Sequence, residues 1–129
     1  MRCPTCREFL ITIEIEKVEI DHCTACGGIW LDSGELELLL EGAANRNELM
    51  AGLTAHTGAT EDDRRCPICS KRLDKVMCGG GEKVLLDVCP RNDGLWFDRG
   101  ELLDVVKMGE FPADHRVFEL IKEVFAGGG

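Results

Sequence analysis

The chain lacks the features that would direct it to a membrane, to secretion or to nucleic acid. No apolar run approaches the roughly 20 residues that a membrane-spanning helix needs. The N-terminal MRCPTCREFL has no apolar segment of signal-peptide length. Positive charge is scarce, with 15 Lys+Arg against 24 Asp+Glu and a net charge of -9, the wrong sign for a main affinity for phosphate. These absences predict a cytoplasmic protein without a membrane partner, and they disfavour nucleic acid as the partner.

Cysteine, in contrast, is abundant, with eight residues in a chain of 129. In a reducing compartment, cysteines more often bind metal or take part in catalysis than form disulfides. Because eight is an even number, a secreted disulfide framework stays as an alternative. The missing signal segment is the main argument against it.

An internal repeat organises the chain. The segment CTACGGIWLDSGEL begins at Cys23, and its near-copy CPRNDGLWFDRGEL begins at Cys89. When the two are aligned on their tryptophans, Cys89 matches Cys23, but Asn92 stands where the first copy has Cys26. Each copy also opens with a Cys-x-x-Cys pair, CPTC in the first and CPIC in the second. The second copy therefore lacks one of its four expected cysteines.

The segment after each opening pair has the pattern of a β-hairpin. Apolar and polar residues alternate over 9–22, with a turn at Glu16-Lys17, and this period of two is typical of a strand with one buried face. In the second copy we expect strands at about 71–77 and 83–88, joined by a turn at Gly79-Gly80-Gly81.

A helix is predicted after each tryptophan. Asp32 precedes Glu35 by three residues and Asp98 precedes Glu101 by three, which is the spacing of a capping box with aspartate as the N-cap. A second short helix is expected from about Asn45. The C-terminal DHRVFELIKEVF is amphipathic, and we expect its helix to bury four apolar residues: Val117, Ile121, Val124 and Phe125.

These patterns divide the chain into three parts. Residues 1–53 hold the first copy with its trailing helices, residues 54–64 lack periodicity and read as a linker, and residues 65–129 hold the second copy with the C-terminal helix. Each copy has only about 40 residues, below the size at which a hydrophobic core alone usually suffices. Each copy therefore needs a further stabilising link, such as a bound metal ion or a disulfide, and the cysteines are the candidates for it.

The first copy offers four sulfurs that can converge on one metal ion. Two Cys-x-x-Cys turns at the base of one hairpin suit tetrahedral zinc, and the ligands would be Cys3, Cys6, Cys23 and Cys26. Iron is a chemically possible alternative in a four-cysteine site. A thioredoxin-like redox pair is a weaker reading, because such a pair opens a helix, whereas CPTC and CPIC each run into a predicted strand.

The quoted motifs resemble the TFIIB-type zinc-ribbon family of bacteria and archaea, often described as transcription-factor zinc fingers. The family pattern is CPxC, a hairpin, then CPxCGGxWLDxGEL, and it covers residues 3–40 closely and 66–106 with one departure. The resemblance implies a zinc-ribbon fold. The expected fold class is a small, metal-stapled α+β protein of two tandem zinc ribbons, each a β-hairpin with two zinc knuckles followed by an α-helix, with an added C-terminal amphipathic helix.

The second copy needs a fourth ligand beside Cys66, Cys69 and Cys89. Asp93 lies next to the vacated position, and a carboxylate is an accepted zinc ligand, so Asp93 is the favoured candidate. An open or absent site, Cys78, a histidine and Asn92 are the alternatives. We expect two zinc ions, with the second bound more weakly because a soft thiolate has been lost.

Cys78 restores the cysteine count, but geometry argues against it as a ligand. It follows Cys69 by nine residues and falls at the predicted hairpin tip, more than about 20 Å from the base at roughly 3.3 Å per residue. We therefore expect an unligated thiol that is open to alkylation.

Function follows less directly from these features. Trp30 and Trp96 could stack on nucleobases, but their fixed place between knuckle and helix favours a structural role, and the three histidines are isolated. We expect a non-catalytic zinc-binding module that binds a protein partner. The alternative is a transcription-associated module that binds nucleic acid or RNA polymerase, for which basic residues around the second copy, including Arg64, would form the surface. A redox or hydrolytic enzyme that uses the incomplete second site is third.

Overall fold

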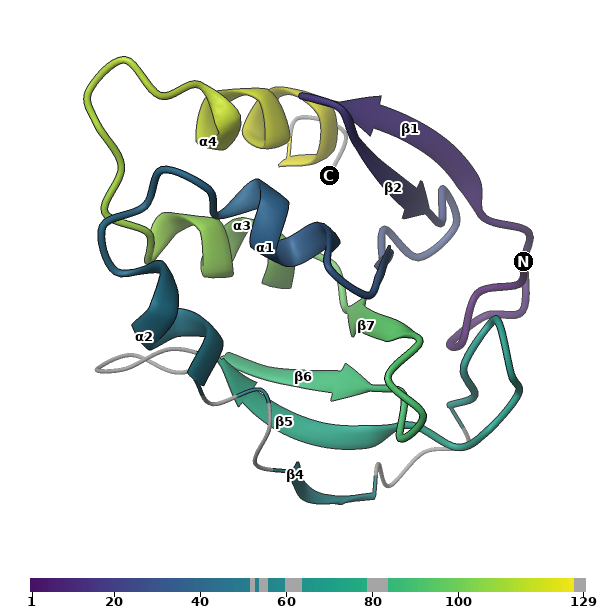
Figure 1. Ribbon diagram of the computed structural model, residues 1–129. Coiled ribbons are helices and arrows are strands. Elements are labelled where there is room, and N and C mark those ends of the chain that lie inside the picture. Colours follow the sequence, from purple (N-terminus) through teal and green to yellow (C-terminus); the bar gives the residue numbers. More distant parts are fainter. Residues whose placement is uncertain (52, 54–55, 60–63, 79–83, 127–129) are drawn as a thin grey trace.

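The first hairpin has the predicted strands and turn. The structure, a computed structural model, describes residues 1–51, 53, 56–59, 64–78 and 84–126 (Figure 1). Strands β1 (Ile11–Ile15) and β2 (Val18–His22) pair antiparallel, with Ile15 opposite Val18. Glu16 and Lys17 have φ angles of 50° and 68°, the positive values that a tight two-residue hairpin turn requires. The prediction for 9–22 is confirmed.

The second hairpin is also present, with a later start than expected. Strands β5 (Asp74–Cys78) and β6 (Val84–Val88) pair antiparallel. Residues 71–73 were predicted to open the strand, but they close the first knuckle, where the Leu73 amide donates to the Arg64 carbonyl at 3.0 Å. The predicted turn at 79–81 lies outside the described residues.

The two copies join edge to edge into one sheet. Strand β3 (Ile29–Asp32) of the first copy pairs antiparallel with β7 (Gly94–Phe97) of the second, and Trp30 faces Trp96 across the pair. The described strands form a sheet in the order β1-β2-β3-β7-β6-β5-β4. Strand β4 (His56–Ala59), which pairs with β5, lies within the segment expected to be a linker. The sheet therefore spans both copies. The division of the chain at 54–64 stays a prediction about which segments fold as units.

Reciprocal packing of glycine and tryptophan closes this junction. A Cβ atom added to Gly28 would overlap the ring of Trp96, and one added to Gly94 would lie 2.7 Å from Cζ2 of Trp30. Gly28 and Gly94 each precede their own tryptophan by two residues, so the same contact is made twice across an approximate twofold axis. Both tryptophans are fully buried.

In the described part of the chain, four short α-helices cover one side of this sheet (Figure 1). They are α1 (Glu35–Leu39), α2 (Arg46–Ala51), α3 (Glu101–Lys107) and α4 (Val117–Ile121), the last continued by the π-helical turn η2 (Lys122–Ala126). Their apolar residues merge with those of both hairpins into one core cluster, in which Leu39, Val105 and Ile121 are buried beside Ile20 and Leu86. The copies therefore share a core as well as a sheet.

The helix starts differ from the predicted capping box. The N-cap residues are Gly34 and Gly100, with φ of 92° and 85°, and no side chain caps either helix. Half of the box is present, because the Glu101 carboxylate accepts a hydrogen bond from the Asp98 amide at 2.7 Å, as Glu35 does from Asp32 at 3.3 Å. The aspartate side chains are not caps, since each accepts the indole N–H of the tryptophan two residues earlier.

The apolar face of β1 is only partly buried. Ile15 is 5% exposed, but exposure rises toward the start of the hairpin, to 51% at Ile11 and 65% at Phe9. The expectation of a fully buried face is wrong at this end, because β1 is the edge strand of the sheet. An exposed apolar strip on an edge strand is a feature that a partner can use.

The C-terminal segment packs against both copies. Helix α4 contacts α3 of the second copy and β1 of the first. Of the residues expected to be buried, Val117 and Ile121 are buried, whereas Val124 is 44% exposed. The side chain of Phe125 lies outside the described residues.

Replacing either junction glycine should destabilise the whole protein. For Gly28→Ala we expect a loss of about 1–3 kcal/mol in the free energy of unfolding, because the new methyl group overpacks the Trp96 ring. Denaturant titration of the zinc-loaded protein measures this loss. In a Trp96→Phe background the smaller ring leaves room, so the additional cost of Gly28→Ala should fall. An equal cost in both backgrounds would contradict the proposed contact.

The half-buried Glu101 should make stability depend on pH. Burial, and then the nearby charge of Asp98, raise the pKa of Glu101 to about 7 from 4.5, against the opposing hydrogen bond from the Asp98 amide. The unfolded chain loses this proton near pH 4.5 and the folded chain near pH 7, so the free energy of unfolding should fall as pH rises through this window. Glu101→Gln should flatten the fall while keeping the acceptor for the Asp98 amide. Glu101→Ala should flatten it too, but at a further cost of about 1 kcal/mol for the lost hydrogen bond.

Candidate metal centres

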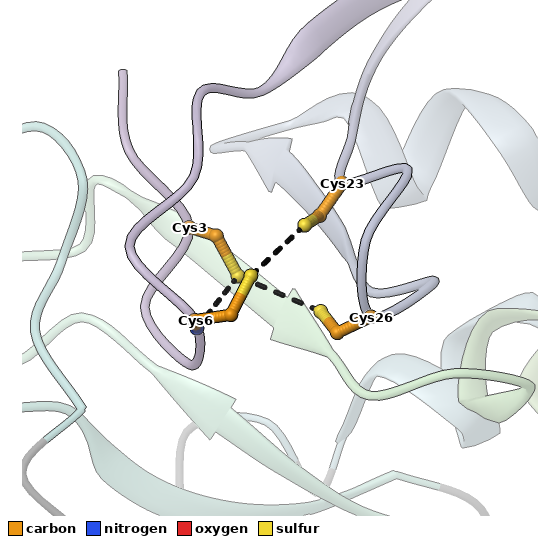
Figure 2. A group of neighbouring side chains, drawn as sticks. All are labelled: Cys3, Cys6, Cys23 and Cys26. Carbon is orange, nitrogen blue, oxygen red and sulfur yellow. Dashed lines mark hydrogen bonds between the residues drawn. The ribbon is translucent and has the colours of Figure 1, made fainter.

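The four cysteines of the first copy converge on one point. Figure 2 shows Cys3 and Cys6 on the N-terminal loop pointing toward Cys23 and Cys26 on the loop after β2. Their Sγ atoms lie within 4.8 Å of one another, at 3.3 Å for Cys6 and Cys23 and 3.6 Å for Cys3 and Cys26. A zinc–sulfur bond of about 2.3 Å implies tetrahedron edges of about 3.8 Å. The separations are close to that value and far above the roughly 2.05 Å of a disulfide.

Backbone geometry holds these thiols in place. The amides of Thr5 and Cys6 point at Sγ of Cys3, at 3.3 and 3.4 Å. In the second knuckle the Gly27 amide donates to the Cys23 carbonyl at 2.8 Å, with Gly27 at a φ of 80°. Amides aimed at sulfur stabilise thiolates, which is the outer-shell support that a metal site needs.

The surroundings already favour a thiolate at one position of this group. Burial alone would raise the pKa of Cys23, but hydrogen bonds from the Cys26 amide and the Cys6 thiol lower it to about 7. Burial raises the pKa of Cys26 to about 12, and its hydrogen bond with Cys3 adds to the rise. A bound cation must displace the remaining thiol protons, so affinity for metal should fall as pH falls.

The second copy forms an equivalent group with a carboxylate in it. One ligand atom each from Cys66, Cys69, Cys89 and Asp93 lie within 4.8 Å of one another. Oδ2 of Asp93 is 3.5 Å from Sγ of both Cys66 and Cys89, and Cys69 is 3.5 Å from Cys89. Zinc–oxygen bonds of about 2.1 Å beside zinc–sulfur bonds of 2.3 Å imply sulfur–oxygen edges of about 3.6 Å. The separations fit such a mixed site.

A tighter turn brings Asp93 to the position of the missing thiol. In the first copy the turn hydrogen bond runs from Gly27 to Cys23, across four residues, whereas in the second it runs from Asn92 to Cys89, across three, at 2.9 Å. Asn92 has a φ of 64°, a left-handed conformation that asparagine adopts more readily than most residues. Asn92 thus has a turn role in the structure, and the side chain of its neighbour faces the sulfurs.

The first copy fixes the backbone of Asp93. The Asp93 carbonyl accepts a hydrogen bond from the amide of Ser33, which belongs to the first copy, at 2.9 Å. Hydrogen bonds from the thiols of Cys69, Cys89 and Cys66 lower the pKa of the Asp93 carboxyl, so it is ionised and ready to bind a cation at neutral pH.

Cys78 is not the accessible thiol that the sequence suggested. It ends β5, is 0% exposed and donates to the Leu49 carbonyl at 3.3 Å. It packs in the shared core with Val76 and Leu86, apart from the two metal-ligand groups. Burial raises the pKa of its thiol to about 11, so we expect slow alkylation. The prediction of an exposed thiol is wrong because helix α2 covers this end of the hairpin.

The other candidate residues have structural roles. The indole N–H of each tryptophan donates to an aspartate, at 2.9 Å for Trp30 and 3.1 Å for Trp96. Both rings are 0% exposed, so neither is open to a nucleobase. His115 stacks on Phe111 with ring centroids 4.1 Å apart. Among the described residues, no histidine belongs to a possible metal group.

An ion-pair network connects segments of the second copy, and no pattern in the sequence predicts it. Arg64 Nη1 lies 2.8 Å from Oδ2 of Asp87 and 2.9 Å from Oδ2 of Asp98, and Lys75 lies 2.9 Å from the other oxygen of the buried Asp87. Arg64, expected on a basic outer surface, is therefore paired with two aspartates, and its side chain is 15% exposed. Buried charges need such partners, but their pairing depends on distant segments.

Two chemical tests support zinc at both groups. The donor sets are four sulfurs and three sulfurs with one carboxylate, which are accepted tetrahedral zinc ligands, and all eight cysteines are free rather than paired in disulfides. The cysteines of both groups pack in one cluster with Trp30 and Trp96. The two clusters fit two zinc sites.

Comparison with known proteins agrees with this geometry. No described helix is long and apolar enough to span a membrane. No curated protein matches the chain, and no solved structure does. The family model described as "Transcription factor zinc-finger" matches residues 2–42 and again residues 65–108, which together are more than half of the chain. With two matched copies and two clusters of metal-ligand residues, this chain belongs to the TFIIB-type zinc-ribbon family.

Proposed function

We propose that the protein is a non-catalytic module in which two zinc ions stabilise a platform that binds a protein partner. The observation that carries the proposal is the position of the metal groups, which lie in one buried cluster with both tryptophans at the junction of the copies. Zinc there connects loops to the sheet, as in structural sites with four protein ligands.

The ligand set of the second site supports a structural role. With Asp93 as the fourth ligand beside Cys66, Cys69 and Cys89, both sites supply four protein donors, which leaves no tetrahedral position for water or substrate. A hydrolytic mechanism needs that open position. The completed set therefore favours a structural zinc ion over the enzyme that the missing cysteine suggested.

A nucleic-acid-binding role is the second candidate, and exposed cations favour it. Arg65, Lys71, Arg72 and Arg91 all lie exposed on the knuckles of the second copy. The net charge of -9 opposes binding to a polyanion, and the buried tryptophans offer no stacking surface.

The second zinc ion should leave before the first. One carboxylate replaces one thiolate without a change in formal charge, but the softer ligand is lost, so zinc should bind more weakly there. In a chelator titration followed by native mass spectrometry, we expect a one-zinc species with the first site filled. Asp93→Ala should weaken the second site by more than the roughly 10–100-fold that loss of an outer-shell partner costs, and Asp93→Cys should tighten it.

Asn92→Gly is the matched control for that experiment. Glycine keeps the left-handed turn but removes the amide oxygen, so zinc content should not change. Loss of zinc in Asn92→Gly but not in Asp93→Ala would assign the fourth ligand to Asn92 instead.

Salt-dependent binding separates the two functional candidates. We expect the zinc-loaded protein to show no saturable fluorescence-anisotropy change with double-stranded DNA, single-stranded DNA or RNA between 50 and 200 mM salt. Saturable binding whose affinity falls steeply with salt, by the slope of roughly -0.9 per phosphate contact expected for double-stranded DNA, would replace the protein partner by nucleic acid. The charge-removing variant Arg72→Ser then tests whether the knuckles form the surface.

A further inference from the structure

The approximate twofold arrangement creates two equivalent grooves. Groove A lies between the second knuckle of the first copy, with Ile29, and the start of α3, and Ile121 of α4 forms its third wall; its volume is about 170 Å³. Groove B lies between Leu95 of β7 and the start of α1, with Met50 of α2 as its third wall, and measures about 260 Å³. Each groove thus joins parts of both copies.

The grooves correspond position by position, but their chemistry differs. Gly100 and Leu102 in groove A match Gly34 and Leu36 in groove B. At two further matched wall positions, groove A has Arg99 and Leu103, whereas groove B has Ser33 and Glu37. At these positions groove A therefore has an aliphatic side chain and a cation, where groove B has a carboxylate and a hydroxyl.

The cation of groove A is the guanidinium of Arg99, which is exposed. The aliphatic carbons of Arg99 lie against Gly27. A Cβ atom added to Gly27 would be 2.9 Å from Cγ of Arg99. Among the residues that the structure describes, none forms a hydrogen bond or ion pair with its guanidinium. An arginine of this kind presents a planar donor set that matches a carboxylate.

Exposed apolar residues extend groove A along the edge of the sheet. Ile11 is paired across the strands with His22, which lines the groove, and cross-strand partners share a face of the sheet. Phe9 follows on the same side, and the guanidinium of Arg2 lies over its ring at 4.1 Å. The surface beside the groove is thus apolar with a second arginine.

We propose that groove A docks an acidic and apolar segment of a protein partner. One large apolar side chain enters the groove, a flanking Asp or Glu pairs with Arg99, and further apolar residues lie on Ile11 and Phe9. The volume is below that of pockets that enclose a whole small molecule, and it suits a single anchoring side chain. The aliphatic side chains of Ile29, Leu103 and Ile121 in its walls suit an apolar side chain of a peptide. This inference rests on the proposed function, because it specifies the partner of that platform.

Selection from a peptide library tests the proposal. The probe is a phage-displayed library of random dodecapeptides, selected on the full-length, zinc-loaded protein. We expect enriched peptides that combine a large apolar residue with Asp or Glu. Arg99→Ser and Leu103→Glu give groove A the residues of groove B, and each should weaken binding of the enriched peptides at least tenfold. Glu37→Gln in groove B is the matched control and should leave binding unchanged.

The outcomes distinguish the inference from the proposed function. Peptides that bind equally well to wild type, Arg99→Ser and Leu103→Glu would overturn groove A as the site, while a peptide-binding platform would stand. No enriched peptide on the zinc-loaded protein would overturn both. Binding of single-stranded DNA that Arg99→Ser weakens would overturn the partner class. Zinc content and thermal unfolding of each variant show that the fold is retained, and Arg99→Ser, at an exposed position, keeps the test valid if Leu103→Glu does not fold.

Discussion

The pairing of β3 with β7 is the interaction on which the rest of the structure depends. Two glycines at equivalent positions let the tryptophan of each copy lie against the backbone of the other. This close approach buries both rings, joins two small hairpins into one sheet and places both metal groups in one cluster. Units of about 40 residues have too little apolar surface to be stable alone, and sharing a core reduces that deficit. Loss of one zinc ion should therefore be felt in both copies, rather than in one alone.

The second copy tolerates its missing cysteine because the change is absorbed locally. The knuckle keeps its length, but its hydrogen-bonded turn spans one residue fewer, with Asn92 in a left-handed conformation. This change moves the next side chain into the vacated position. The hydrogen bond from Ser33 of the first copy holds that backbone in place. The cost is a harder ligand and a weaker expected zinc site. Tertiary contact with an intact copy thus supports a site that has lost a thiolate.

Duplication gave the protein two similar grooves, and divergence made them different. The positions that shape the backbone, such as Gly34 and Gly100, are the same in both copies. The positions that set the chemistry of the walls, Ser33 and Arg99 among them, are not. The groove walls can change while the junction stays the same. A structural repeat can in this way acquire a binding site on one side only.

The sequence alone determined the repeat, the first hairpin with its turn, the helix positions and the cysteine pairs, because each depends on neighbours within a few residues. It also placed Asp93 beside the vacated position, and the structure brings that carboxylate to the three sulfurs. Tertiary structure decided what local patterns cannot encode. Cys78 is buried because a helix from the other copy covers it, Arg64 is engaged by two distant aspartates, and Ile11 is exposed because its strand lies at the edge. The physical reason is the same in each case: burial and pairing at these residues depend on which edges the two copies present to each other, and the pairing of β3 with β7 settles that.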